Sequence, residues 1–164
     1  MLKTRIHNIN SGAYAAILVR RYLKRVWWAY ALPAAVFIGL GAADVRFIFL
    51  AVIYLFLVTP MIMGFALTAY GLVAESRYSI LRHTLEASPS GLTFTFVDDN
   101  DNATATETVE WGAIGCAQPT SKHIVMPLRH RRFRFIAIPY TAFDSPALLR
   151  QFMELLRASN VQVK

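Results

Sequence analysis

The sequence predicts an α+β membrane protein, with a two-helix transmembrane hairpin followed by a small antiparallel β domain that ends in one amphipathic helix. Two apolar runs, residues 26–43 and 47–74, lie close together. From residue 75 onwards, short strand-like segments alternate with turn residues, and apolar residues recur at helical spacing near the end. We therefore divide the chain into residues 1–25, 26–74 and 75–164.

The second apolar run carries the membrane prediction. Its 28 residues include no Asp, Glu, Lys, Arg or His, and as a helix they would extend about 42 Å, against a hydrocarbon core of about 30 Å. Fifteen of them are Phe, Ile, Leu or Val, which favour insertion. The first run is weaker because it contains Pro33 and two glycines. We expect it to insert together with the second run.

Two other interpretations of the apolar runs are weaker. Buried core helices of a soluble protein usually keep a polar stripe, and a chain of 164 residues has little other material to cover two apolar helices. A signal peptide cleaved after Ala43 is disfavoured because 25 residues precede the first run. Cleavage there would still leave a spanning helix.

The charge distribution predicts the orientation. Residues 1–74 carry seven basic and one acidic side chain, and residues 75–164 carry ten and nine, so the net charge of +7 lies mainly beside the membrane. By the positive-inside rule, both termini are cytoplasmic, and Trp27 and Trp28 lie at the headgroup layer. Basic residues concentrated beside the membrane, next to a near-neutral domain, favour anionic lipids as partners and argue against nucleic acid.

The N-terminal 25 residues are expected to form a short extended piece and a helix. Residues 3–9 form the extended piece, and Asn10 or Ser11 caps a helix that continues into the first membrane span.

Residues 75–164 predict about six short antiparallel strands. Ser88–Gly91 forms one turn, and residues 98–102 form a polar hairpin tip. Ser145 and Pro146 begin the last helix, since a capping hydroxyl followed by proline suits a helix N-terminus. The predicted strands are 78–87, 92–97, 103–110, 114–118, 124–128 and 133–138.

The chain resembles the YcxB-like family of bacterial membrane proteins in its order of helix, hairpin and domain. The similarity is carried by Arg77 and Tyr78, the Ser90–Leu92 turn, the Trp111–Ile114 step and the 135–143 segment. Tyr140 stands where the family favours a basic residue. The resemblance implies a pleckstrin-homology-like C-terminal domain and a multi-pass location in the bacterial inner membrane. It implies no particular activity.

No catalytic or metal-binding constellation is predicted, and no cofactor. His7, His83, His123 and His130 are scattered along the chain without ligand spacing. Cys116 is the only thiol, so an intramolecular disulfide is impossible. A lipid-modifying enzyme would need a polar cluster at the membrane face, which the sequence does not offer.

The first candidate site is a basic hairpin next to His130. In a domain tethered to a bilayer, it could reach anionic headgroups or a protein partner. The competing interpretation is a solvated turn, or a partner for the acidic tip at residues 98–101. The candidate residues are Arg129, Arg131, Arg132 and Arg134.

The second candidate site is an interruption of the long apolar helix at Thr59, Pro60 and Gly64. Proline bends a helix, and the bend could dock another membrane helix, from a toxin or a homo-oligomeric partner. A simple packing kink is the competing interpretation, because Pro and Gly are common in spanning helices.

From these observations we expect a non-enzymatic inner-membrane protein that displays a binding domain to the cytoplasm, for a protein segment or anionic lipid headgroups. The alternative is an immunity or resistance protein whose membrane hairpin neutralises a membrane-acting toxin or bacteriocin.

Overall fold

A computed structural model describes residues 2–71, 74–129 and 133–163. The chain folds into two compact units. The first contains residues 1–14 together with residues 73–164, and the second contains residues 15–72. The first unit is therefore built from both ends of the chain, and the second is the segment between them.

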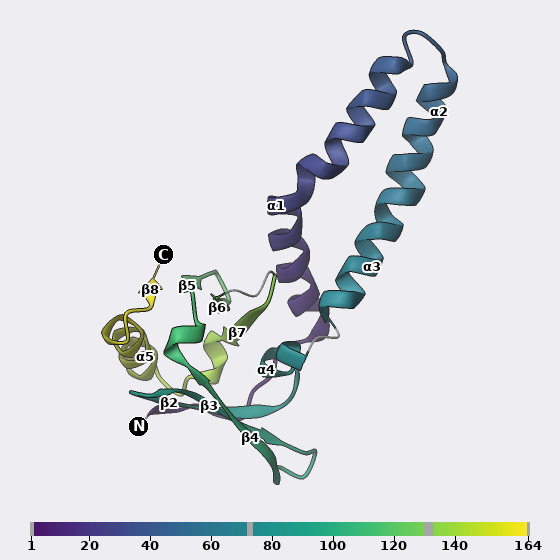
Figure 1. The fold of residues 1–164 in the computed structure, drawn as a ribbon. Helices are drawn as coiled ribbons and strands as arrows, with labels where there is room; N and C mark the ends of the chain where they lie inside the picture. Colours follow the sequence, from purple (N-terminus) through teal and green to yellow (C-terminus); the bar gives the residue numbers. More distant parts are fainter. Residues whose placement is uncertain (1, 72–73, 130–132, 164) are drawn as a thin grey trace. The chain divides into compact units, whose positions relative to one another are not determined.

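The second unit is a pair of helices (Figure 1). Helix α1 (Ser11–Leu40) begins in the first unit, where the Asn10 side-chain oxygen accepts a hydrogen bond from the Gly12 N–H at 2.8 Å. This confirms the predicted cap. After a turn at residues 41–45, α2 (Arg46–Ile53), the π-helical η1 (Tyr54–Val58) and α3 (Thr59–Gly71) follow one another without a break.

Ring contacts show that the two helices are antiparallel. The ring centroids of Tyr22 and Tyr70 lie 6.4 Å apart, and those of Phe37 and Tyr54 lie 6.0 Å apart. The residue number rises from 22 to 37 along α1 while the number of its partner falls from 70 to 54, which is the pattern of antiparallel packing. We call α1 from residue 15 onwards, together with α2, η1 and α3, the helix pair.

Within the described residues, one helix is long and apolar enough to cross a membrane, Arg46–Gly71. Its side chains are mostly uncovered, and Phe56 and Phe65 are each 79% exposed. Large exposed apolar side chains on a helix are what a lipid environment accommodates. Helix α1 is longer, but Pro33 and many alanines dilute its apolar half. The structure thus supports one span, and the transmembrane hairpin is not shown.

The first unit contains two four-stranded sheets. The first sheet is antiparallel throughout, in the order β1-β2-β3-β4, and the second has the order β7-β6-β5-β8 and is antiparallel except for β8, which runs parallel to β5. The expected α+β class with antiparallel sheets is confirmed. The strands are β1 (Leu2–Lys3), β2 (His83–Ser88), β3 (Gly91–Val97), β4 (Ala103–Glu110), β5 (Cys116–Pro119), β6 (His123–Pro127), β7 (Phe135–Pro139) and β8 (Gln162–Val163).

Helix α5 (Pro146–Ala158) closes this unit as predicted. The Ser145 hydroxyl accepts a hydrogen bond from the Leu148 N–H at 3.2 Å, and Pro146 occupies the first turn. Phe152 and Leu156 are fully buried in a core that both sheets share. Other members of that core are Leu85, Leu92, Phe94, Ile114, Ile124, Met126, Ile136 and Ile138.

The predicted strand over residues 78–87 is wrong in its first half. Arg77–Ile80 forms a helical turn, α4, and β2 begins only at His83. The turn buries Ser79, whose hydroxyl accepts a hydrogen bond from the Ala137 N–H at 3.0 Å. That contact to β7 outweighs the local strand propensity of the segment. Single helical turns also occur at η2 (Ala74–Ser76), η3 (Trp111–Ala113) and η4 (Tyr140–Ala142).

Residues 2–9, which we call the N-terminal strap, lie along the edge of the first sheet. β1 pairs with β2 through Leu2 opposite Ala87. Further on, His7 and His83 exchange backbone hydrogen bonds of 2.9 and 3.1 Å, and the Ile9 N–H donates to the Ser79 carbonyl at 2.8 Å. Although the sequence suggested a separate N-terminal segment of residues 1–25, its first 14 residues fold with residues 73–164.

Candidate functional site

The structure describes two arginines of the predicted basic hairpin, Arg129 and Arg134, and gives them different surroundings. Arg134 forms an ion pair with Glu75, and both side chains are largely covered. Arg129 is exposed at the end of β6, where its N–H donates to the Ala113 carbonyl at 2.7 Å. Arg131 and Arg132 lie outside the described residues, as does His130. Of the four predicted candidates, Arg129 is therefore shown to be solvent-facing and Arg134 is shown to be part of the fold.

The Glu75–Arg134 pair lies beside the first turn of α1. The Tyr14 ring stacks on Phe135 at 4.7 Å between centroids. Burial, reinforced by the Glu75 carboxylate, raises the pKa of Tyr14 to about 12. Tyr14, Glu75 and Arg134 thus join the start of the first helix, the segment that follows the helix pair, and the residue just before β7. All three belong to the first unit.

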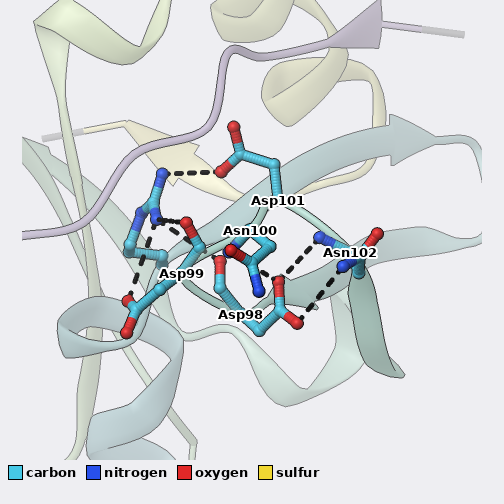
Figure 2. A network of polar contacts seen from close by, with 6 residues as sticks. Asp98, Asp99, Asn100, Asp101 and Asn102 are labelled. Carbon is cyan, nitrogen blue, oxygen red and sulfur yellow. Dashed lines mark hydrogen bonds and ion pairs between the residues drawn. The ribbon is translucent and has the colours of Figure 1, made fainter.

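Among the described residues, the cation that contacts the acidic tip between β3 and β4 is Arg82, which does not belong to the predicted basic hairpin. Figure 2 shows that the Asp98 carboxylate accepts hydrogen bonds from the backbone N–H groups of Asn100 and Asn102, at 2.9 and 2.8 Å. These bonds hold the pKa of Asp98 below its ordinary value. The cation at this tip is Arg82, which contacts Asp101 at 2.7 Å. The carboxylates of Asp98 and Asp101 thus have their partners within the turn or in Arg82.

The predicted kink residues Thr59, Pro60 and Gly64 lie in α3, which follows the π-helical turn η1 directly. The Thr59 N–H donates to the Tyr54 carbonyl, a bond one residue longer than in an α-helix. Proline clashes with the carbonyl four residues back, and a π turn relieves that clash by widening the helix. Pro60 and Gly64 are exposed, and the Gly64 carbonyl accepts a hydrogen bond from the Thr68 hydroxyl at 2.9 Å. The helix is therefore distorted just before Pro60, and Pro60 and Gly64 lie on its exposed surface.

A basic collar lies on α1 immediately before two exposed tryptophans. We give this name to Arg20, Arg21, Lys24 and Arg25, of which all except Arg21 are exposed. Trp27 and Trp28 are 61% and 60% exposed. Sequence reasoning used these residues for orientation and to favour anionic lipids as partners, but did not include them among the candidate site residues. The signal was present as a run of cations followed by aromatic residues on one helix.

Two histidines that look unrelated in the sequence meet inside the first unit. The rings of His7 and His83 lie 4.4 Å apart between centroids, and both are buried. The Nδ1 atoms lie 2.9 and 2.8 Å from the carbonyls of Arg5 and Leu81. Because a carbonyl only accepts hydrogen bonds, each Nδ1 carries the proton. Each Nε2 is then a buried acceptor, without a partner among the residues that the structure describes.

Burial lowers the pKa of His83 to about 4, and the neighbouring His7 adds to this effect. The pKa of His7 is also lowered, mainly by burial. Both rings are therefore neutral at physiological pH. In the described part of the chain, no group of three or more His, Cys, Asp or Glu side chains could hold a metal ion. The pair is a packing contact between the N-terminal strap and β2.

No protein-family model, curated protein or solved structure matches this chain. The resemblance to the YcxB-like family therefore stays a prediction.

Proposed function

We propose that this protein is a non-enzymatic component of a bacterial inner membrane that presents its β-rich unit to the cytoplasm as a binding module. The helix pair is the membrane anchor, and both termini are cytoplasmic. The ligand is an anionic lipid headgroup or a protein segment.

One observation carries the proposal: residues 1–14 and 73–164 form a single folded unit. A hydrogen-bonded sheet cannot be divided by a bilayer, because its backbone groups would lose their partners. The chain between residues 14 and 73 must then cross the membrane an even number of times. If Arg46–Gly71 spans, α1 must also span. This supports the hairpin, although α1 alone is weakly apolar.

The basic collar supports binding of anionic lipid by the anchor itself, because it lies on α1 outside the β-rich unit. In the proposed topology, the collar precedes the first span, and Trp27 and Trp28 lie at the interface. Each Lys or Arg near an anionic surface contributes about 1 kcal/mol of attraction. The basic hairpin contributes less to this argument, because Arg134 is already paired with Glu75.

Lipid retention by the full-length protein tests this assignment. The protein is placed in nanodiscs of mixed phosphatidylglycerol and phosphatidylcholine, and the lipids retained after detergent extraction are identified by native mass spectrometry. The collar variant Arg20→Gln/Lys24→Gln/Arg25→Gln should lose the enrichment of phosphatidylglycerol. A matched variant with the same charge change, Lys122→Gln/Arg150→Gln/Arg157→Gln, should keep it, since these residues are exposed elsewhere. Equal enrichment in the two variants would contradict the lipid assignment.

The β-rich unit also suits the pleckstrin-homology-like domain that the YcxB-like resemblance implies. Two largely antiparallel sheets share a core with a C-terminal helix. We propose this fold assignment on the architecture alone.

An immunity or resistance function is the second candidate. It is favoured by the π turn next to Pro60, since such turns occur frequently at functional sites. Survival of toxin-challenged cells that express only residues 1–76 would favour it, because those residues lack most of the β-rich unit. Loss of protection in the Pro60→Ala variant would place the toxin contact at the π turn.

A further inference from the structure

Strand β4 is an open edge of the first sheet. It lies at the end of the order β1-β2-β3-β4, and no described strand pairs with its outer side. It is eight residues long, and its side chains are exposed except at Glu107 and Val109. An open edge presents unpaired N–H and C=O groups that another strand can use.

The other sheet edges in the described structure are protected. β1 and β8 have two residues each, and Lys3 projects from β1 with its side chain 64% exposed. β7 is buried along its whole length. Short edges, edge lysines and coverage are the usual means of preventing strand pairing. The segment 103–110 has none of these three, since it contains neither lysine nor proline. Its only irregularity among the described residues is a register shift at Thr104, at the start of the strand, so residues 105–110 form a regular open edge.

The register shows which backbone groups of β4 face outwards. The two-residue turn between β2 and β3 makes Ser88 and Gly91 a hydrogen-bonded pair. Because such pairs alternate along an antiparallel ladder, Phe94 pairs by hydrogen bonds with Glu107. The N–H and C=O groups of Thr106 and Thr108 then point away from β3.

We propose that two copies of this protein pair through β4, antiparallel and about a two-fold axis at Thr106, so that the two first sheets become one continuous sheet. Residues 104–108 read Thr-Ala-Thr-Glu-Thr, which is nearly the same in both directions. In this register Thr106 faces its own copy and Thr104 faces Thr108. Cross-strand threonine pairs are favourable.

Charge also favours this register. Glu107 lies opposite Ala105 of the other copy, so the two glutamates do not face one another. An axis at Glu107 would place like charges directly opposite, which is destabilising. Each Glu107 is also compensated within its own chain, by Arg77 at 2.6 Å and by the Tyr78 hydroxyl at 2.6 Å. A second copy therefore meets no unpaired charge at the centre of the strand.

Disulfide trapping of the full-length protein tests the pairing. In a Cys116→Ser background, Thr106→Cys should crosslink to its own copy under mild oxidation, because directly opposite residues of a hydrogen-bonded pair have Cα atoms about 5.5 Å apart. Thr95→Cys is the matched control, since Thr95 is the direct neighbour of Thr106 on β3. Two copies of Thr95 would lie about 14 Å apart, three strand spacings, which is too far for a disulfide.

We expect the crosslinked dimer to be on the order of tenfold more abundant for Thr106→Cys than for Thr95→Cys. Thr106→Pro should keep the sheet, because its lost N–H points outwards, and should yield a monomer in detergent by light scattering. Equal crosslinking of the two cysteine variants, no crosslinking of Thr106→Cys, or an unchanged mass for folded Thr106→Pro would overturn the proposal. The pairing can be measured in detergent, so its failure is distinct from failure of the membrane or lipid assignment.

Discussion

At the residue scale, the charged and titratable side chains of the β-rich unit serve mainly to hold distant segments together. His7 contacts His83, Arg134 binds Glu75, and Arg82 closes the acidic tip. Each contact joins residues far apart in the chain or at the two ends of a hairpin. Because each of these side chains has a contact within the fold, substituting any of them should mainly lower the free energy of unfolding.

The histidine pair predicts an acid-labile domain. His83 has an ordinary pKa of 6.5 when unfolded and about 4 when folded, so between these values the unfolded chain binds a proton that the folded chain excludes. Stability is then full above about pH 6.5 and falls towards pH 4, by about 3 kcal/mol in all. An NMR titration of the imidazole in micelles should place the His83 pKa near 4. The protection factors of the β2 amides, which correct for slower intrinsic exchange at low pH, should fall over the same range. Titration of His83 near its ordinary value would contradict the prediction.

Arg134 and Arg129 should behave oppositely although both lie in the predicted hairpin. Arg134→Gln leaves the largely covered Glu75 carboxylate without its ion pair, and we expect a loss of about 2 kcal/mol. Arg129→Gln removes an exposed charge and should change stability by less than about 0.5 kcal/mol.

Chemical unfolding in micelles measures both variants through tryptophan fluorescence. Replacing Trp27 and Trp28 with Phe leaves Trp111, a core residue, as the reporter. Equal destabilisation by the two variants would argue against the structural role of Arg134.

At the element scale, the N-terminal strap and the π turn both adopt conformations that are unfavourable in isolation and are stabilised by their surroundings. A two-residue strand has no stability of its own, yet β1 is held because the rest of the strap also pairs with β2 and α4. The π turn is unfavourable in isolation but accommodates Pro60. The strap thus makes the sheet depend on residues that precede α1.

Two isoleucines of the strap allow a matched test of that dependence. Ile9 is 3% exposed and Ile6 is 38% exposed. Ile9→Ala should cost about 2–4 kcal/mol by leaving a cavity, whereas Ile6→Ala should cost less than about 1 kcal/mol. Chemical unfolding followed through Trp111 measures both. If Ile9→Ala were as mild as Ile6→Ala, the strap would not be an integral part of the sheet.

At the scale of the whole molecule, the chain leaves the β-rich unit once and returns to it once. In the proposed topology, this connectivity means that both ends of the helix pair lie on the same side of the bilayer. The topology is therefore testable separately from the identity of the ligand.

Cysteine labelling checks this topology. In a Cys116→Ser background, single cysteines replace Asn8 in the strap, Ala42 in the turn between the helices, and Ser121 between β5 and β6, all of them exposed positions. In intact spheroplasts, an impermeant maleimide should label the Ala42→Cys variant. The Asn8→Cys and Ser121→Cys variants should be labelled only after lysis. Opposite behaviour of the variants at 8 and 121 would refute the even number of crossings, whereas inversion of all three would refute only the orientation.

The amino-acid sequence by itself determined the long apolar helix, expected over residues 47–74 and found over 46–71, most of the strands and the cap of α5. These features depend on periodicity, turn residues and capping within a few neighbours. Only the tertiary structure decided that His7 faces His83, that Arg134 is taken by Glu75, and that residues 77–80 form a helical turn. Those outcomes rest on contacts between residues far apart in the chain, and local hydrophobic pattern carries no information about which distant side chains will meet.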